Sequence, residues 1–500
     1  MADAKTKTIC VNQKTLCSSQ LWTIVCLSLA FWPVWAWYLA RTFDKSDEPW
    51  GLVALATAVL FLVVGSRSAP TPGSADAGRA ANPGSAGVPP ASGILTDPNS
   101  IAGAAFLCAY VITYPFAPHL VQAILLVLTV WFFVVSKFAS PSKPGLLGLL
   151  LLSLPLIPSL NFFFGYPLRI IVAAGTCMML NNLGMSAVRE GIMVTANGHL
   201  TAIDAPCSGI SMLWAESYVV MLLACVFRLD LKCTSILSLL ALLFIIAGNA
   251  LRATTLITFD KLASVDAAHH LSAHHLSQLE PSVHIGAGLL VFSAVCGLTI
   301  MVASALSGRM VQKSRVQSQA PKMLFAHTPI NFANALGPLC LAAALIPCIA
   351  HPTGSTVTSD TPPNWPTEIN GNKVLSVNSL AEERVFAQDF PGQMKRFTDG
   401  TNSYFVRFVQ RETRQLHPSS DCFKGLGYQI EPHPMFVAED GSKWGSFEAV
   451  KSNSRYLILE RIFDDSGFSS TDVSEWYWLA CLGKTHGPWF DVTIAQPLCP

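Results

Sequence analysis

The chain has 500 residues, of which 51% are hydrophobic and only 13% are charged, and its formal net charge is +1. With a mean hydropathy of +0.44, so much apolar surface cannot be hidden in a soluble protein of this length, and the bilayer must be its main solvent. The balanced charge gives no basis for a nucleic-acid partner or an acidic substrate. The 14 cysteines are scattered without a CxxC pair, which argues against a zinc ribbon or a disulfide scaffold.

The apolar stretches predict a polytopic α-helical membrane protein with about nine spans, because one span needs about 17 to 25 apolar residues. The expected spans lie near residues 21–40, 50–65, 101–116, 119–138, 145–164, 209–227, 235–256, 285–305 and 331–350. We expect residues 1–350 to form this membrane domain. Within it, residues 66–98 are rich in Pro, Gly, Ala and Ser, a composition that is typical of a flexible linker and that we place in the cytoplasm.

A further apolar stretch, residues 168–184, decides the expected topology. Lysines near the N-terminus, Lys137 with Lys143, and the basic loop 309–322 all belong in the cytoplasm by the positive-inside rule. These three assignments agree only if residues 168–184 do not cross, so we expect an interfacial or re-entrant helix there. The N-terminus is then cytoplasmic, and the tail lies outside the inner membrane of a bacterium.

The tail, residues 351–500, has the charge density and the aromatic content of a soluble α+β domain. Residues 404–409 and 455–460 alternate like strands, and Val473–Leu482 has the pattern of an amphipathic helix. Two of the three cysteines in the tail could be oxidised to a disulfide outside the cytoplasm, and the sequence does not decide which two. They are Cys422, Cys481 and Cys499.

The polar residues most suggestive of chemistry lie at the ends of apolar stretches. Residues 193–203 alternate around an Asn-Gly pair, which predicts a small hairpin that delivers Cys207 to the start of a helix. Arg252 and His284 lie near the corresponding ends of the next two spans. Because these spans alternate in direction, the three residues should meet at one membrane face. A thiol, a guanidinium and an imidazole together suit acyl transfer through a thioester.

Three further residues are expected to support this site. Ser208 follows the cysteine and is expected to cap the helix or to pack closely with Gly209. Asn249 lies three residues before Arg252 in the same span. No cofactor and no metal are expected. Histidines 269, 270, 274 and 275 precede Glu280 without the HExxH order of a zinc hydrolase, and a solvated external loop is expected there.

The segments Ala205–Ile210, Gly248–Arg252 and His284–Gly288 resemble, in order and spacing, the signature segments of the exosortase/archaeosortase family, and the resemblance covers about residues 100–305. It implies a membrane-embedded cysteine transpeptidase or protease. Such enzymes act on secreted proteins whose C-terminal sorting signal has a short Pro-Glu-Pro-like motif, a transmembrane helix and basic residues. It implies Cys207 as the nucleophile and His284 as general base and then acid. Arg252 would stabilise the thiolate or the oxyanion.

A second resemblance concerns the tail. Residues 417–428 are similar to the His/Cys/Gly segment of an exosortase-associated domain that is linked to exopolysaccharide. They depart from its pattern in detail, so no catalytic role is carried over to His417 or Cys422. The resemblance implies an accessory part in handling the substrate or a polysaccharide, with exopolysaccharide machinery as a partner.

A non-enzymatic protein is the alternative to these readings, either a transporter or an exopolysaccharide assembly factor. A transporter should show paired half-helices or inverted repeats around a site at the middle of the membrane. Neither is evident in the sequence, and the polar residues gather at one end of the spans. The sequence therefore favours the enzyme.

Overall fold

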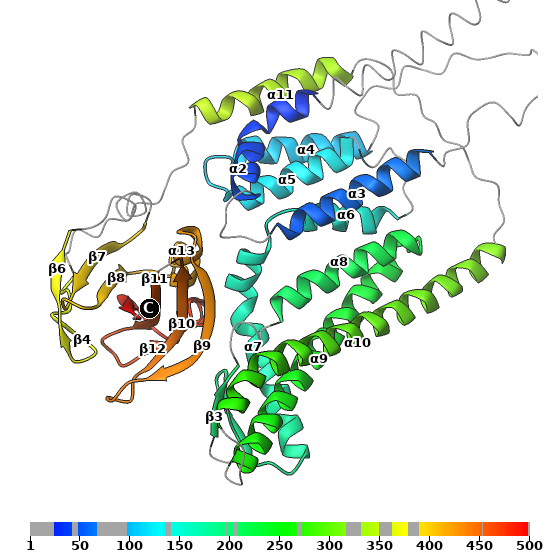
Figure 1. Ribbon diagram of the computed structural model, residues 1–500. Coiled ribbons are helices and arrows are strands. Elements are labelled where there is room, and N and C mark those ends of the chain that lie inside the picture. The colour runs from blue at the N-terminus through cyan, green and yellow to red at the C-terminus, as the bar shows by residue number, and fades with distance from the viewer. Residues whose placement is uncertain are drawn as a thin grey trace, which may run out of the picture.

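The structure is a computed structural model, and its described residues fall into a helical unit and a β-rich C-terminal unit (Figure 1). It describes residues 25–42, 49–67, 98–133, 135, 142–196, 199–203, 209–267, 273–316, 332–349, 363–378, 390–452 and 454–498. The helices of the first unit are α2 (Trp32–Thr42), α3 (Trp50–Arg67), α4 (Pro98–Thr113), α5 (His119–Phe133), α6 (Lys143–Leu152), α7 (Ile157–Asn182), α8 (Ile210–Val226), α9 (Leu231–Ala267), α10 (Ala273–Val316) and α11 (Phe332–Ile349). Nearly all of the expected linker 66–98 lies outside the described residues.

Three of these helices are long and apolar enough to cross a membrane within the described residues. They are α7, the Leu231–Phe259 part of α9 and the Gly286–Gly308 part of α10. Six others are apolar but shorter: α3, α4, α5, α6, α8 and α11. The chain is therefore a helical membrane protein with a β-rich C-terminal unit, whereas the expected count of about nine spans is not confirmed.

The expectation for residues 145–184 is wrong in its boundaries. The predicted span 145–164 is divided, because α6 ends at Leu152 and Ser153 forms its C-cap. Pro155 follows this cap and has no backbone amide to continue the helix. The predicted separate helix 168–184 is the second half of α7, which continues through Pro167. In Figure 1, α7 runs steeply across the direction of α8, α9 and α10.

Helices α8, α9 and α10 contact one another and form the centre of the helical unit. They alternate in direction along the chain (Figure 1). At the junction between α8 and α9, the Leu229 carbonyl accepts a 2.8 Å hydrogen bond from the hydroxyl of Ser142, the N-cap of α6. The start of α6 and the end of α8 therefore share one end of the bundle. The start of α8, where the catalytic cysteine is expected, lies at the opposite end.

A small antiparallel sheet leads into α8. Its strands are β1 (Ala187–Glu190), β2 (Met193–Ala196) and β3 (His199–Ala202). Strands β2 and β3 pair as the sequence predicts, while β1 was not expected and the Asn-Gly turn lies outside the described residues. Buried apolar side chains of this sheet pack on α7 and on Ala253 of α9. The sheet therefore sits at the end of the bundle where α8 begins.

The C-terminal unit is built on an antiparallel sheet in the order β6-β7-β8-β13-β11-β10-β9, with β12 paired to β11. Its elements are β4 (Glu368–Ile369), β5 (Asn372–Lys373), β6 (Leu375–Val377), β7 (Gln393–Thr398), β8 (Ser403–Val409), α13 (Ser419–Gly425), β9 (Gln429–Val437), β10 (Lys443–Lys451), β11 (Ser454–Phe463), β12 (Ser469–Ser470), α14 (Val473–Cys481) and β13 (Trp489–Pro497). Strands β8 and β11 and helix α14 match the three elements expected from the sequence. Apolar side chains of β8, β11 and β13 form its main core.

Helix α14 docks on the part of α7 that Pro167 opens. The Ser474 hydroxyl donates to the Phe162 carbonyl at 2.7 Å and accepts from the Tyr166 amide at 3.1 Å, so it is inserted between a helical donor and its usual acceptor. The Trp478 indole donates to the Phe163 carbonyl at 2.7 Å. This is the carbonyl that a residue with an amide at position 167 would have bonded. The C-terminal unit thus replaces the hydrogen bonds that the proline disrupts.

An ion pair lies beyond the proline on the same helix. Arg169 is only 4% exposed, and its Nη2 atom lies 2.6 Å from Asp472 Oδ1 at the start of α14. Asp472 is also the N-cap of α14, since its side chain accepts from the Glu475 amide. The docking contacts therefore lie on both sides of Pro167.

Candidate active site

The segment 248–253 of α9 is where the helices around the expected site meet. A Cβ atom on Gly248 would lie 2.9 Å from Val291 of α10, and a Cβ atom on Gly175 of α7 would lie 3.0 Å from the Ala250 methyl group. Small residues therefore let α9 approach both neighbours closely, as is common where helices pack in membranes. The close packing fixes how α9 presents the residues between these contacts.

Asn249 lies directly against the start of α8. Gly209, the N-cap of α8, has a φ of +77°, a backbone conformation that side chains disfavour. A Cβ atom there would overlap the Asn249 amide nitrogen and would lie 2.9 Å from its Cγ atom. Asn249 is 3% exposed, and its Oδ1 atom has no hydrogen-bond partner among the described residues. The Asn249 amide thus packs against Gly209, which follows Cys207 by two positions in the chain.

The guanidinium of Arg252 lies against α10. A Cβ atom on Gly288 would be 3.5 Å from both Cζ and Nε of Arg252, an ordinary van der Waals distance, so Gly288 lies directly beside the guanidinium. Because Asn249 and Arg252 are three residues apart, they share one face of α9. His284 precedes Gly288 by four residues, or about one helical turn.

The structure brings together the neighbours of all three expected catalytic residues. Cys207 and Ser208 lie outside the described residues, and only the backbone of His284, within α10, is described. Their adjacent motif residues are described: Gly209 contacts Asn249, and Gly288 contacts Arg252. The three motifs therefore converge at the end of the bundle where α8 begins.

Glu216 is a polar residue of this region that the sequence reasoning missed. It is fully buried on α8 and accepts hydrogen bonds from the Thr299 hydroxyl at 2.5 Å and from the Cys296 thiol at 3.3 Å, both on α10. The sequence carries a signal for it, since a lone carboxyl inside an apolar helix needs a partner on a neighbouring helix. The pair Cys296 and Thr299 provides two donors at helical spacing.

The described residues contain no group of three or more His, Cys, Asp or Glu side chains that could hold a metal ion. The four histidines before Glu280 fall outside that search, because His269 and His270 lie outside the described residues and only the backbone is described for His274 and His275. The last two belong to α10, so the loop expected there ends earlier than the sequence suggested.

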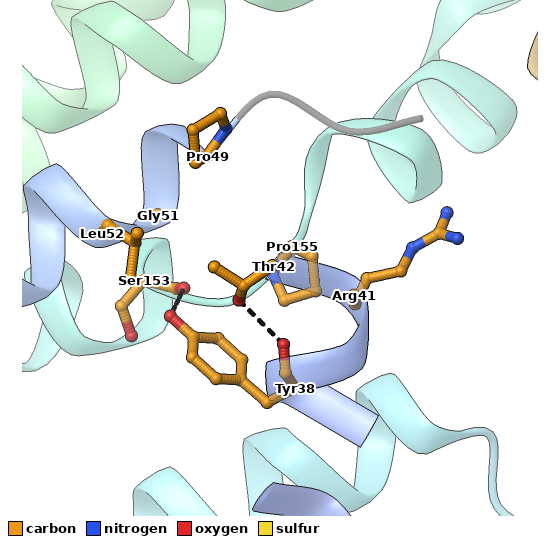
Figure 2. Close-up of a pocket in the computed structure, with 8 residues that line it drawn as sticks. All are labelled: Tyr38, Arg41, Thr42, Pro49, Gly51, Leu52, Ser153 and Pro155. Carbon is orange, nitrogen blue, oxygen red and sulfur yellow. Dashed lines mark hydrogen bonds between the residues drawn. The ribbon is translucent and has the colours of Figure 1, made fainter. Parts of the chain in front are cut away.

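A hollow of about 290 Å³ lies elsewhere in the helical unit. It is lined by the end of α2, the start of α3 and the connection from α6 to α7. Figure 2 shows that the Tyr38 hydroxyl closes one side of it by donating to the Ser153 carbonyl, at 3.0 Å. None of the described residues of the three motifs lines this hollow. It is therefore separate from the candidate active site.

The cysteines of the C-terminal unit bear on the expected disulfide. Cys422 and Cys481 both have free thiols in the structure, so they are not joined to each other there. Cys499 lies outside the described residues. Cys422 instead contacts His417, as described below.

Comparison with known proteins gives one result. A family model described as transmembrane exosortase matches residues 18–301, which is more than half of the chain. No curated protein and no solved structure matches significantly. The family match contains all three motifs and the helices that position them.

Proposed function

Because the chain belongs to the transmembrane exosortase family, we propose that it is a membrane-embedded cysteine transpeptidase or protease. Its substrates are secreted proteins that end in a Pro-Glu-Pro-like motif followed by a transmembrane helix and basic residues. Cys207 is the nucleophile, His284 the general base and acid, and Arg252 the group that binds developing negative charge. Ser208, Gly209 and Asn249 position the cysteine.

The observation that carries this proposal is the paired contact of Gly209 with Asn249 and of Gly288 with Arg252. Each contact joins one motif to another, and both involve the same face of α9. A polytopic transporter would instead need its polar residues near the middle of the membrane. The described motif residues Gly209, Asn249, Arg252 and Gly288 instead meet at the end of the bundle where α8 begins, apart from the polar contacts of Glu216 with Cys296 and Thr299 farther along α8 and α10. The position of the motifs supports the enzyme over the transporter or assembly factor.

In the proposed reaction, the Cys207 thiol gives its proton to His284 as its sulfur bonds to the scissile carbonyl carbon. Arg252 faces the oxyanion, since a guanidinium stays charged and donates several hydrogen bonds in a fixed plane. His284 then gives the proton to the leaving amine, and a thioester remains on Cys207. Water or an amine resolves it. The sorting-signal helix leaves with the amine.

The orientation follows from the distribution of charge. The end of the bundle opposite the site contains the start of α6 with Lys143, the turn after α8 with Arg228, and the end of α10 with Arg309. Basic residues next to spans remain in the cytoplasm. We therefore place the active site and the C-terminal unit on the extracytoplasmic side of a bacterial inner membrane.

The direct test is co-expression with a secreted protein that carries such a signal. Cys207→Ala and Cys207→Ser should abolish its processing while both variants still accumulate in the membrane. Cys108→Ala, which alters an exposed cysteine of α4, is the matched control and should process normally. Normal processing by the Cys207 variants would remove the nucleophile assignment.

Arg252→Lys tests whether the positive charge of Arg252 is sufficient or whether its planar hydrogen-bond donors are also needed. Lysine retains the positive charge but lacks the planar set of donors. We expect a loss of more than about tenfold in processing rate if oriented hydrogen bonds stabilise the transition state. A rate equal to that of the parent would show that the charge alone is sufficient.

A further inference from the structure

The C-terminal unit holds a second thiol and imidazole in contact. The Cys422 Sγ atom, on α13, lies 3.3 Å from His417 Nε2. The other ring nitrogen, Nδ1, lies 2.9 Å from the Gln415 carbonyl oxygen. A carbonyl oxygen only accepts, so Nδ1 carries the hydrogen and Nε2 presents its lone pair to the thiol. This is the arrangement that lets an imidazole take a proton from a nucleophile.

A buried ionic cluster holds the loop that carries this pair. Arg407 on β8 is 1% exposed. Its Nη1 atom donates to the His417 carbonyl at 2.8 Å, and Nη2 pairs with Glu460 and with Asp491. Glu460 in turn accepts the Ser419 amide at 2.8 Å. The backbone is thus anchored at two positions beside the pair. Buried ionic clusters add little stability over apolar packing, but this one fixes the position of the loop.

The surroundings keep both partners neutral at pH 7. Burial, with a smaller effect of the Arg407 charge, lowers the pKa of His417 to about 4. Burial raises the pKa of the Cys422 thiol to about 11, although Arg407 opposes the shift. The resting pair is therefore a thiol that donates to a neutral imidazole. The imidazole accepts the proton only as the sulfur bonds to an electrophile.

Two other roles for a half-buried cysteine find no support in the described residues. A metal site needs a third ligand, and no such group is present among them. A disulfide with Cys481 is excluded because both thiols are free. The contact with His417 instead fits a nucleophilic thiol.

The pair lies on the side of the C-terminal unit that faces α2. The positive charge of Arg41, near the end of α2, contributes to lowering the pKa of His417. Burial raises the pKa of Asp421, next to the cysteine, against the opposing charges of Lys424 and Arg41. In Figure 2 the Arg41 side chain extends away from Tyr38 and Ser153. The membrane domain therefore adds the positive charge of Arg41 to the larger effect of Arg407 from the C-terminal unit.

We propose that Cys422 and His417 form a second acyl-transfer site, which accepts an acyl group from an ester or thioester donor at the junction of the two units. The sulfur bonds to the acyl carbon as the thiol proton moves to His417 Nε2. The carbon–oxygen or carbon–sulfur bond of the donor breaks, and the leaving alcohol or thiol takes that proton. The products are a thioester on Cys422 and a free alcohol or thiol. This site is independent of the function proposed for Cys207.

The test uses p-nitrophenyl acetate on the full chain in detergent, with Cys207→Ala to remove the other expected nucleophile. Acetylation of each cysteine is followed by mass spectrometry of its peptide. Cys481, exposed in the same unit, is the internal control. We expect Cys422 to react about tenfold faster or more, and His417→Asn to reduce its rate to about that of the control or below.

The pH profile distinguishes this pair from a cysteine that is merely packed beside a histidine. With a neutral imidazole as base, the rate at Cys422 should be nearly constant from about pH 6 to 8.5, whereas a lone thiol rises about tenfold per pH unit below its pKa. This measurement needs no variant of the pair and so does not depend on whether His417→Asn folds. A rate at Cys422 that rises like that of Cys481, or that does not exceed it, would overturn the proposal.

Discussion

Replacing Trp478 with phenylalanine should weaken the docking of the C-terminal unit on α7. The substitution keeps an aromatic ring but removes the indole donor to the Phe163 carbonyl, a 2.7 Å hydrogen bond. Pro167 has no amide to replace it. Leaving one buried acceptor without a donor costs about 1–3 kcal/mol, which corresponds to an undocking equilibrium about 5- to 150-fold more favourable.

Hydrogen–deuterium exchange of α14 in the full chain measures this change, because exchange reports local opening. Trp478→Phe should speed exchange of Val473–Cys481 by that factor. Trp444→Phe is the matched control, since the Trp444 indole donates to Ser442 within its own hairpin at 2.9 Å. It should leave exchange of α14 unchanged.

Repeating Trp478→Phe in a Pro167→Ala variant tests whether the indole matters because the proline lacks an amide. Alanine restores an amide that can bond the Phe163 carbonyl within α7, so Trp478→Phe should then cost at least about 1 kcal/mol less. An equal cost in both backgrounds would refute the idea that the indole replaces the hydrogen bond lost at the proline. Unchanged exchange in Trp478→Phe alone would refute the docking role itself.

Three further outcomes follow from single residues. Gly209→Ala should reduce substrate processing more than about tenfold, because it adds a Cβ at positive φ that overlaps an amide; Gly297→Ala, with open space around it, should process normally. Glu216→Ala should lower the unfolding free energy by about 1–3 kcal/mol by leaving the Thr299 hydroxyl without its acceptor, and an unchanged thermal midpoint would contradict this. Folding lowers the pKa of His417 from 6.5 to about 4, so a proton on this imidazole binds more strongly to the unfolded chain. The stability that depends on a neutral His417 is therefore fully present above about pH 6.5 and is lost as the pH falls towards 4. His417→Asn should thus be less sensitive to acid by about 1–3 kcal/mol in thermal unfolding, and parallel curves would contradict the shift.

Features that depend on local sequence could be predicted. Alternation around an Asn-Gly pair is sufficient to predict that β2 pairs with β3, because the turn residues fix the register of a hairpin. The apolar runs likewise place the starts of α8 and α11 within one or two residues of their observed positions. The convergence of the three motifs at one end of the bundle was inferred from span order alone, and the contacts of Asn249 and Arg252 agree with it.

The path of α7 could not be predicted, because its cause is remote in the chain. Pro167 predicts a break in a helix when only neighbouring residues are considered. The donors that satisfy the opened turn, Ser474 and Trp478, lie more than 300 residues away. Strand β1 was missed for a similar reason, since only Ala187 of its four residues is buried and the residues that bury it are on α7. Glu216 was missed because its partners are on another helix.

The docking contacts on both sides of Pro167 link the C-terminal unit to the candidate active site. Ser474 and Trp478 bind the turn before the proline, and Asp472 pairs with Arg169 after it. Together they set the angle between the two halves of α7. The second half packs against α9 at Gly175, beside Asn249. A change in this angle should therefore displace the wall of the site.

Asp472→Asn tests this coupling because it removes the charge that pairs with Arg169 but keeps the oxygen that caps α14. We expect slower processing with little change in thermal midpoint. The matched control is Asp440→Asn, an exposed aspartate of the same unit whose side chain also accepts a backbone amide; it should process normally. Normal processing by Asp472→Asn, with exchange of α14 clearly accelerated, would show that the site does not depend on how the C-terminal unit is docked.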